Sequence, residues 1–206
     1  DAATAAPAAY GGGDRREARD LEQVHLILGF EGVGYLDDGY YAAQVMSVLM
    51  GGGMSSRLFQ EIRETRGLAY AIYSFNATYR DGGLFAVYAG TGPEEIPELV
   101  DVLCHELGRA ADDINEAEVA RARAQIRAGV LMSLESTASR AEQLARQMII
   151  LGRPLPTDEL IERIEAVDTN AVADVLRRML ASKPTVAALG PVAKLDDYDG
   201  IVARLH

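Results

Sequence analysis

Apolar and polar residues alternate along two stretches of the chain in the way that half-buried β-strands require. In the first stretch the apolar set is Val24, Leu26, Leu28 and Phe30. In the second stretch, which follows Gly67, the apolar and aromatic set is Ala69, Ala71, Tyr73, Phe75, Ala77 and Tyr79, and the residues between are mostly polar. Because successive side chains of a strand point to opposite faces, we predict two strands, with Phe75 in the core and Tyr70 on the wetter face.

The rest of the pattern predicts two more strands and a series of helices. Residues 80–83 are typical of a hairpin turn and predict a returning strand over 84–91, and residues 184–189 predict a last strand. Apolar spacing together with start and stop signals predicts seven helices. Their ranges are 37 or 38 to 50, 56–66, 93–111, 115–134, 137 or 139 to 151, 157–166 and 169–180. This order indicates an α+β fold, a mostly antiparallel sheet covered on one face by helices.

Residues 51–70 form a loop, a helix, a stop and the start of a strand. Gly51, Gly52 and Gly53 allow backbone angles that other residues avoid. Either of two serines, Ser55 or Ser56, can then cap a helix. Arg63 and Arg66 fall in its last turn, where cations suit the helix dipole. Gly67 stands where a left-handed residue ends a helix, and a turn there can aim Arg63 and Tyr70 at one cleft.

The stretch GGGMSSRLFQEIRETRGLAY, residues 51–70, resembles the C-terminal half of the pitrilysin, insulysin and mitochondrial processing peptidase family. These proteins are zinc peptidases with an inverted zinc motif. The likeness runs from LEQVH at 21–25 through EVARA at 118–122, SLES at 133–136 and GRP at 152–154 to KPT at 183–185. The resemblance implies the metallohydrolase fold of that family, with glycines 51–53 facing a substrate chamber. In the family an arginine and a tyrosine in the second half bind the substrate backbone, and Arg63 and Tyr70 occupy those places.

Arg63 and Tyr70 also have ordinary structural explanations. An arginine in a last helical turn complements the dipole, and a tyrosine at a strand start is often a packed surface aromatic. The glycine triplet can equally be a helix end followed by a flexible link. In the functional interpretation, a guanidinium and a phenol both donate to a peptide carbonyl and to the oxyanion that develops from it. Arg66, one turn from Arg63, is the weaker candidate.

Potential metal ligands are scarce in this sequence. The histidines are His25, His105 and His206, and none is four residues from another, as the inverted motif requires. The cluster Cys104, His105 and Glu106 would point in three directions on a helix, so we predict no metal site in this chain. Cys104 is then expected to be a core thiol, His25 to lie on a strand's outer face, and His206 to be mobile at the terminus. The resemblance implies zinc in the full enzyme, held by another half.

Composition narrows the class of protein. The 206 residues carry a net charge of -11 with a pI near 4.7, which argues against nucleic-acid and anionic-membrane partners. We find no apolar run of about 18 residues and no signal peptide. A single cysteine forbids an internal disulfide and favours the cytoplasm, with the periplasm as the alternative. The alanine- and glycine-rich start predicts an interdomain linker over 1–20 and one domain over 21–206. The start at Asp1 suggests a piece of a longer protein.

Two functions follow as hypotheses. In the first, this chain is the second half of a zinc endopeptidase: it closes the cleavage chamber, binds the peptide substrate through Arg63 and Tyr70, and is inactive alone. Its partner is an N-terminal zinc-binding half, on the same chain or on a partner subunit, and a homodimer is possible. In the second, it is an inactive structural or assembly domain like the respiratory-complex core proteins that resemble this family. The arginine–tyrosine pair favours the first.

Overall fold

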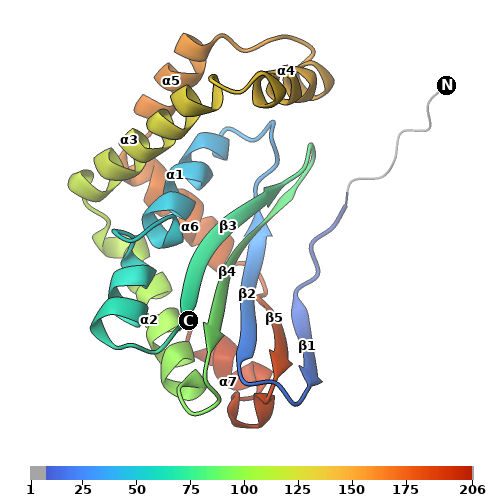
Figure 1. Cartoon of the computed structure of the whole chain (residues 1–206), viewed down its shortest axis with the longest axis vertical. Coiled ribbons are helices and arrows are strands. Elements are labelled where there is room, and N and C mark those ends of the chain that lie inside the picture. The colour runs from blue at the N-terminus through green and yellow to red at the C-terminus, as the bar shows by residue number, and fades with distance from the viewer. Residues whose placement is uncertain (1–7, 206) are drawn as a thin grey trace, which may run out of the picture.

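A five-stranded sheet forms one layer of the molecule, and the helices form the other (Figure 1). The computed structural model describes residues 8–205. The strands are β1 (Gly13–Ala18), β2 (Val24–Gly32), β3 (Ala71–Thr78), β4 (Gly83–Thr91) and β5 (Thr185–Gly190), in the spatial order β1-β5-β2-β4-β3. Only β1 and β5 run parallel, and the other pairs are antiparallel. The predicted, mostly antiparallel sheet is therefore confirmed.

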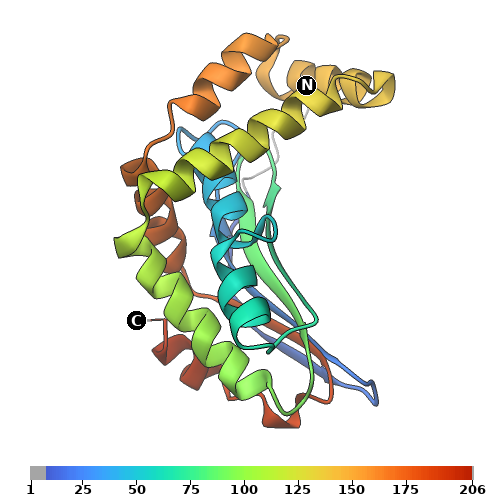
Figure 2. The ribbon, with the colours of Figure 1, turned by 60° about the vertical axis from the view of Figure 1, so that its left-hand side comes forward.

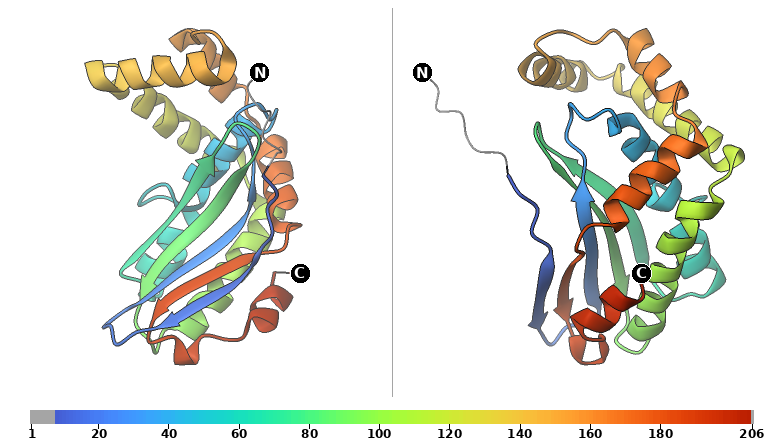
Figure 3. Two further views of the ribbon diagram at one scale, coloured as in Figure 1. Left: turned by 90° about the vertical axis from the view of Figure 1, so that its right-hand side faces the viewer. Right: turned by 180° about the vertical axis from the view of Figure 1, so that it is seen from behind.

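Helices cover one face of this sheet and leave the other face open (Figures 2 and 3). They are α1 (Tyr40–Gly51), α2 (Ile96–Asp113), α3 (Glu116–Ser133), α4 (Thr137–Leu151), α5 (Thr157–Glu165), α6 (Thr169–Leu180) and α7 (Tyr198–Ala203), with a π-helix η1 (Phe59–Thr65) and a short 3-10 helix η2 (Val192–Lys194). The predicted α+β fold is confirmed. In the described part of the chain, no helix is both long and apolar enough to cross a membrane.

The core lies between the sheet and α1, α2 and α6. Val24, Leu26, Leu28 and Phe30 on β2 are all buried, as their alternation predicts. They join buried side chains of the helices, such as Leu103 on α2, in one continuous cluster. Burial of apolar surface from every layer in one cluster makes these elements a single folding unit.

The predicted facing of β3 is wrong by one residue. Ile72 and Ser74 are buried against the helices, whereas Phe75 is 36% exposed on the open face. The Ser74 hydroxyl donates to the Ser47 carbonyl at 2.6 Å, and the Asn76 amide donates to the Ala43 carbonyl at 2.9 Å. Short polar side chains let α1 approach the strand, and the carbonyls of α1 satisfy their hydrogen bonds. Tyr70 is exposed as predicted, but it stands before the strand rather than in it.

A strand also occupies part of the stretch that the composition describes as a linker. Residues 13–18 form β1, which pairs in register with β5 from Gly13 opposite Thr185 to Ala18 opposite Gly190. Residues 1–7 and the terminal His206 lie outside the described residues. Because β1 is charged and joins the sheet through backbone hydrogen bonds, hydrophobic patterning does not reveal it.

Candidate functional site

The segment that leads into β3 contains a π-helix. Helical structure begins at Arg57 and is π-helical over Phe59–Thr65. No serine side chain caps it, contrary to the prediction, because the Ser56 hydroxyl donates to the Gly53 carbonyl at 2.6 Å instead. The predicted stop is confirmed: Gly67 has a φ of 66°, and the Leu68 amide donates to the Ile62 carbonyl at 2.8 Å. π-Helical turns are frequent at functional sites.

The three arginines of this segment differ in their partners. Arg57 binds Glu118 at 2.7 Å and also Asp113, and Arg66 binds Glu61 at 2.9 Å. The exposed Arg63 has no carboxylate partner among the described residues, and its guanidinium carbon lies 4.8 Å from the centroid of the Phe59 ring. Its five N–H donors can therefore bind an incoming acceptor.

Tyr70 is 66% exposed, while the backbone on either side of it is held. The Tyr70 amide donates to the Gly90 carbonyl at 2.9 Å. The Thr91 hydroxyl donates to the Leu68 carbonyl at 2.5 Å, and the Gly67 amide donates to the Arg63 carbonyl at 3.2 Å. The structure places the two predicted side chains at the surface on either side of the Gly67 turn, with their backbones fixed.

The three glycines comprise the last residue of α1, Gly51, and the start of a packed loop, Gly52 and Gly53. A Cβ atom on Gly51 would lie 2.4 Å from the Ser74 amide nitrogen, so only glycine allows α1 to approach β3 this closely. The Gly52 carbonyl accepts a hydrogen bond of 2.7 Å from the Gln125 amide of α3, and Gly53 lies beside the same side chain. The loop is thus tied to α3, a contact that the prediction of a flexible link did not include.

An ion pair between Arg57 and Glu118 joins the helical turn just before η1 to the start of α3. Burial alone would raise the pKa of Glu118, but hydrogen bonds from Arg57 and from the Asn115 amide outweigh it and hold the pKa below its ordinary value. Asn115 and Glu118 also form the predicted capping box of α3. The segment that carries Arg63 is thereby anchored to the helical layer.

The described residues do not fit a zinc ion. No group of three or more histidine, cysteine, aspartate or glutamate side chains comes together in them. Cys104 is buried, as predicted, and burial raises the pKa of its thiol to about 12. Next to it, His105 is exposed and Glu106 binds Arg109 at 2.8 Å. Nδ1 of His25 shares a hydrogen bond of 2.7 Å with the Tyr88 hydroxyl.

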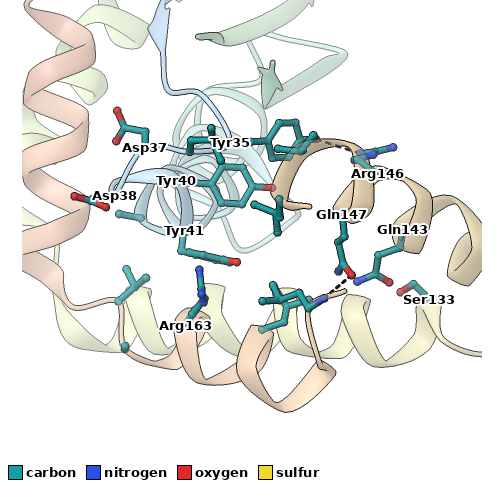
Figure 4. A pocket seen from close by; sticks show the side chains of 18 of the residues that line it. Tyr35, Asp37, Asp38, Tyr40, Tyr41, Ser133, Gln143, Arg146, Gln147 and Arg163 are labelled. Atoms are coloured by element: carbon teal, nitrogen blue, oxygen red, sulfur yellow. Dashed lines mark hydrogen bonds between the residues drawn. The ribbon is translucent and has the colours of Figure 1, made fainter. Parts of the chain in front are cut away.

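A groove of about 800 Å³ lies between α4 and the start of α1 (Figure 4). Tyr35, Tyr40 and Tyr41 line one side of it, and Arg146 and Arg163 reach in from α4 and α5. Helix α4 and the start of α1, which border the groove, lie at the end of the sheet where the β3–β4 hairpin turns (Figure 1). Strand β3, which Tyr70 precedes in sequence, begins at the opposite end. Sequence analysis missed the groove, although three tyrosines within residues 35–41 were a visible signal.

The family follows from comparison with known proteins. The model of the family described as the peptidase M16 inactive domain matches residues 3–126 of this chain. The chain therefore belongs to the M16 peptidase family and corresponds to its inactive domain, as the resemblance of residues 51–70 indicates.

Several relatives are named zinc proteases. One of Rickettsia felis, described as an uncharacterized zinc protease, is 39% identical over 186 residues, which cover 90% of this chain and 45% of the relative. Another of Streptomyces coelicolor is 35% identical over 91% of this chain and 40% of the relative. A third of Bacillus subtilis is 33% identical over 84% of this chain and 42% of the relative. This chain spans less than half the length of these relatives.

A solved structure has the same fold. A chain in the structure of complex III2 from Candida albicans, with Inz-5 bound, superposes with a TM-score of 0.88 at 21% identity. The match covers 97% of this chain and 50% of that chain. At this identity the likeness concerns the fold alone.

Proposed function

We propose that this chain is the substrate-binding half of a zinc endopeptidase whose metal site lies on another, N-terminal half. The observation that carries the proposal is Arg63, exposed and without a carboxylate partner in the described residues, on a π-helix that ends shortly before the Gly67 turn and the exposed Tyr70. Relatives that are named zinc proteases and are about twice as long support a second half. Zinc on that half would polarise the scissile carbonyl and activate water.

In this proposal Arg63 and Tyr70 bind the peptide backbone. The guanidinium donates to a substrate carbonyl and holds it in place before the reaction. The phenol of Tyr70 donates to an oxygen whose negative charge develops in the transition state, where a donor contributes most to the rate. The remaining surface would help to close the chamber around the peptide.

A polypeptide that contains both halves allows a test with a fluorogenic peptide. Tyr70→Phe keeps the ring and should lower kcat by about 100-fold with little change in KM, because a single oxyanion donor contributes on that order. Arg63→Ala should lower kcat and raise KM, since it also removes a contact to the ground-state carbonyl. Both variants should retain zinc and melting temperature.

Arg66→Ala is the matched control, because Arg66 lies on the same segment but already forms ion pairs with Glu61 and Glu98. It should leave both constants near wild type. If the Tyr70→Phe variant is folded, holds zinc and turns over at the wild-type rate, Tyr70 does not donate to the developing oxyanion and the assignment is wrong. If the wild-type protein itself holds zinc and cleaves no peptide, the chain is a structural domain instead.

A further inference from the structure

The groove between α4 and the start of α1 has the size and the wall of a small-molecule site. Its volume is about 800 Å³, within the range of about 300–1,000 Å³ that such sites have. Apolar side chains of α4, of α5 and of the segment between them line one side, among them Ile150, Leu151, Leu155 and Leu160. A wall of this kind removes the apolar body of a ligand from water.

Three tyrosine rings line the other side of the groove (Figure 4). The ring centroids of Tyr35 and Tyr40 lie 5.1 Å apart, and those of Tyr40 and Tyr41 lie 5.0 Å apart with the rings edge to face. Aromatic rings pack well at centroid separations of about 4.5–7 Å, either offset or edge to face. A ligand with aromatic rings would therefore extend this cluster.

The tyrosine hydroxyls in the groove are available as donors. Figure 4 shows those of Tyr40 and Tyr41 directed into the groove, toward the side of α4. The Tyr40 hydroxyl makes no hydrogen bond with the described residues. Burial raises the pKa of both phenols, although the charge of Arg163 partly opposes this at Tyr41. Both phenols therefore stay protonated at neutral pH and can donate to an acceptor on a ligand.

Positive charge is in excess beside Tyr41. Arg163 reaches over the Tyr41 ring, with its guanidinium carbon 5.8 Å from the ring centroid. Arg163 and Arg153 bind the same carboxylate, that of Glu159, at 2.5 Å and 2.6 Å. Two guanidinium groups thus share one carboxylate, and Arg163 retains N–H donors for a second one.

The other carboxylates around the groove do not compensate this charge. Asp37 binds Arg178 at 2.8 Å, and Glu142 binds Arg146 at 2.7 Å. Figure 4 shows Asp37 and Asp38 pointing away from the groove, on the side of the tyrosines opposite their hydroxyls. The polar groups that a ligand would meet inside the groove are therefore mainly donors, and the charge there favours an anion.

We propose that this groove binds a small aromatic carboxylic acid, with its rings against the tyrosine wall and its carboxylate held by Arg163 and the Tyr41 hydroxyl. The proposal goes beyond the proposed function, because neither Arg63 nor Tyr70 lines the groove. Helix α4 contributes a wall of the groove and has no buried side chain. A bound ligand adds contacts to α4 and should therefore make it more ordered.

The experiment uses this chain as it stands, since its described residues share one core. The probe is pyrene-1-carboxylate, and its matched control is pyrene-1-carboxamide, which keeps the rings without the charge. Equilibrium dialysis should show the acid binding about tenfold more tightly than the amide, because hydrogen bonds to a charged group are the stronger ones. The bound acid should also slow hydrogen exchange in α4 and leave α2 unchanged.

Two neighbouring substitutions on α4 test the place of binding. Ile150 lines the groove, whereas Ile149 is 76% exposed and does not line it. Ile150→Glu places a carboxylate in the groove and should abolish binding of the acid, while Ile149→Glu adds the same charge outside the groove and should leave the affinity unchanged. Neither side chain is buried, so both variants should fold.

Two further substitutions test the carboxylate contacts. Arg163→Met and Tyr41→Phe should each weaken binding of the acid by about tenfold, the loss of one hydrogen bond to a charged group. Both should change the affinity for the amide much less, and that difference separates a contact from a general loss of shape. Arg127→Met is the control, because Arg127 is similarly exposed and paired but does not line the groove.

Four results would overturn the proposal. Equal affinities for acid and amide would mean that the groove does not select a carboxylate. Equal weakening by Ile150→Glu and Ile149→Glu would place the probe on the outer face of α4. Absence of binding would leave the groove without this function. Slow exchange in α4 without probe, in a chain that forms dimers, would make a second copy the occupant. These outcomes are independent of the Tyr70→Phe kinetics, so either proposal can fail without the other.

Discussion

Helices α2 and α4 have similar lengths and similar apolar spacing, yet they pack very differently. Ten residues of α2 are buried, among them Leu99, Leu103 and Leu107. None of α4 is buried, and Leu144, Met148 and Ile149 are exposed. Figures 1 and 2 show α2 lying along the sheet and α4 projecting beyond it with the end of α3. Apolar periodicity therefore identified both helices correctly but did not show which of them joins the core.

Local contacts, rather than burial, hold α4 in place. The Ser136 hydroxyl accepts a hydrogen bond from the Ser139 amide, and Gly152 ends the helix with a φ of 72°. Arg146 donates to the Tyr35 hydroxyl at 3.2 Å, and Gln147 accepts from the Leu155 amide at 2.8 Å. An isolated helix needs roughly 12–15 residues to reach even marginal stability in water, and α4, with 15 residues and no buried side chain, is at that limit. It should therefore open at lower free energy than the core.

The largest expected effect comes from removing a core leucine. Leu107→Ala should lower the free energy of unfolding by about 2–5 kcal/mol, since it leaves a cavity in the core beside α2. Leu144→Ala, the matched change on α4, should alter it by less than about 0.5 kcal/mol, because an exposed side chain loses little. Urea unfolding of both variants measures the difference. Equal losses would mean that α4 belongs to the core after all.

A smaller effect is expected where η1 is joined to α3. The Arg57 and Glu118 side chains are 10% and 15% exposed, so Glu118→Gln should lower the free energy of unfolding by about 1.5–3 kcal/mol, as for hydrogen bonds to charged groups. Glu142→Gln, which changes the exposed partner of Arg146 on α4, should have an effect below about 0.5 kcal/mol. Urea unfolding at pH 7 gives both values.

The same ion pair predicts a pH dependence. The folded protein holds the pKa of Glu118 below its ordinary value of 4.5, so the unfolded chain takes up this proton first on acidification. The stabilising contribution of the Glu118 carboxylate is complete above its ordinary pKa and is lost as the pH falls through its pKa in the folded protein. The Glu118→Gln variant should therefore lose less stability than wild type in that acid range. Parallel curves for the two proteins would contradict the assignment.

Much of the fold followed from the sequence because local signals agreed with one another. The capping box at Asn115 and the left-handed Gly67 fix helix ends through their own backbone geometry. Which face of β3 is buried could not be predicted in this way. The polar Ser74 lies on the buried face because its hydroxyl donates to a carbonyl of α1, a partner distant in sequence.

The candidate site was predictable in part. The sequence points to Arg63 and Tyr70 through their resemblance to a family motif. The sequence could not show which arginine lacks a carboxylate partner. Glu118 and Glu98, which bind Arg57 and Arg66, come from other helices, and Arg63 has no such partner in the described residues. The groove under α4 likewise arises from three separate segments. Spacing along one element cannot reveal such arrangements.

The smallest effect should appear only in local exchange. Gln147→Ala removes the acceptor of the Leu155 amide, one of the contacts that hold α4 near the groove. Because a neutral hydrogen bond contributes about 0.5–1.5 kcal/mol, amides of α4 should exchange about 2–10-fold faster. The global unfolding transition should not move, since the core is untouched. Hydrogen exchange resolved by residue measures both, with Gln143→Ala as control, because Gln143 lines the same groove from the same helix. Faster exchange in α2 as well would show that α4 and the core open together.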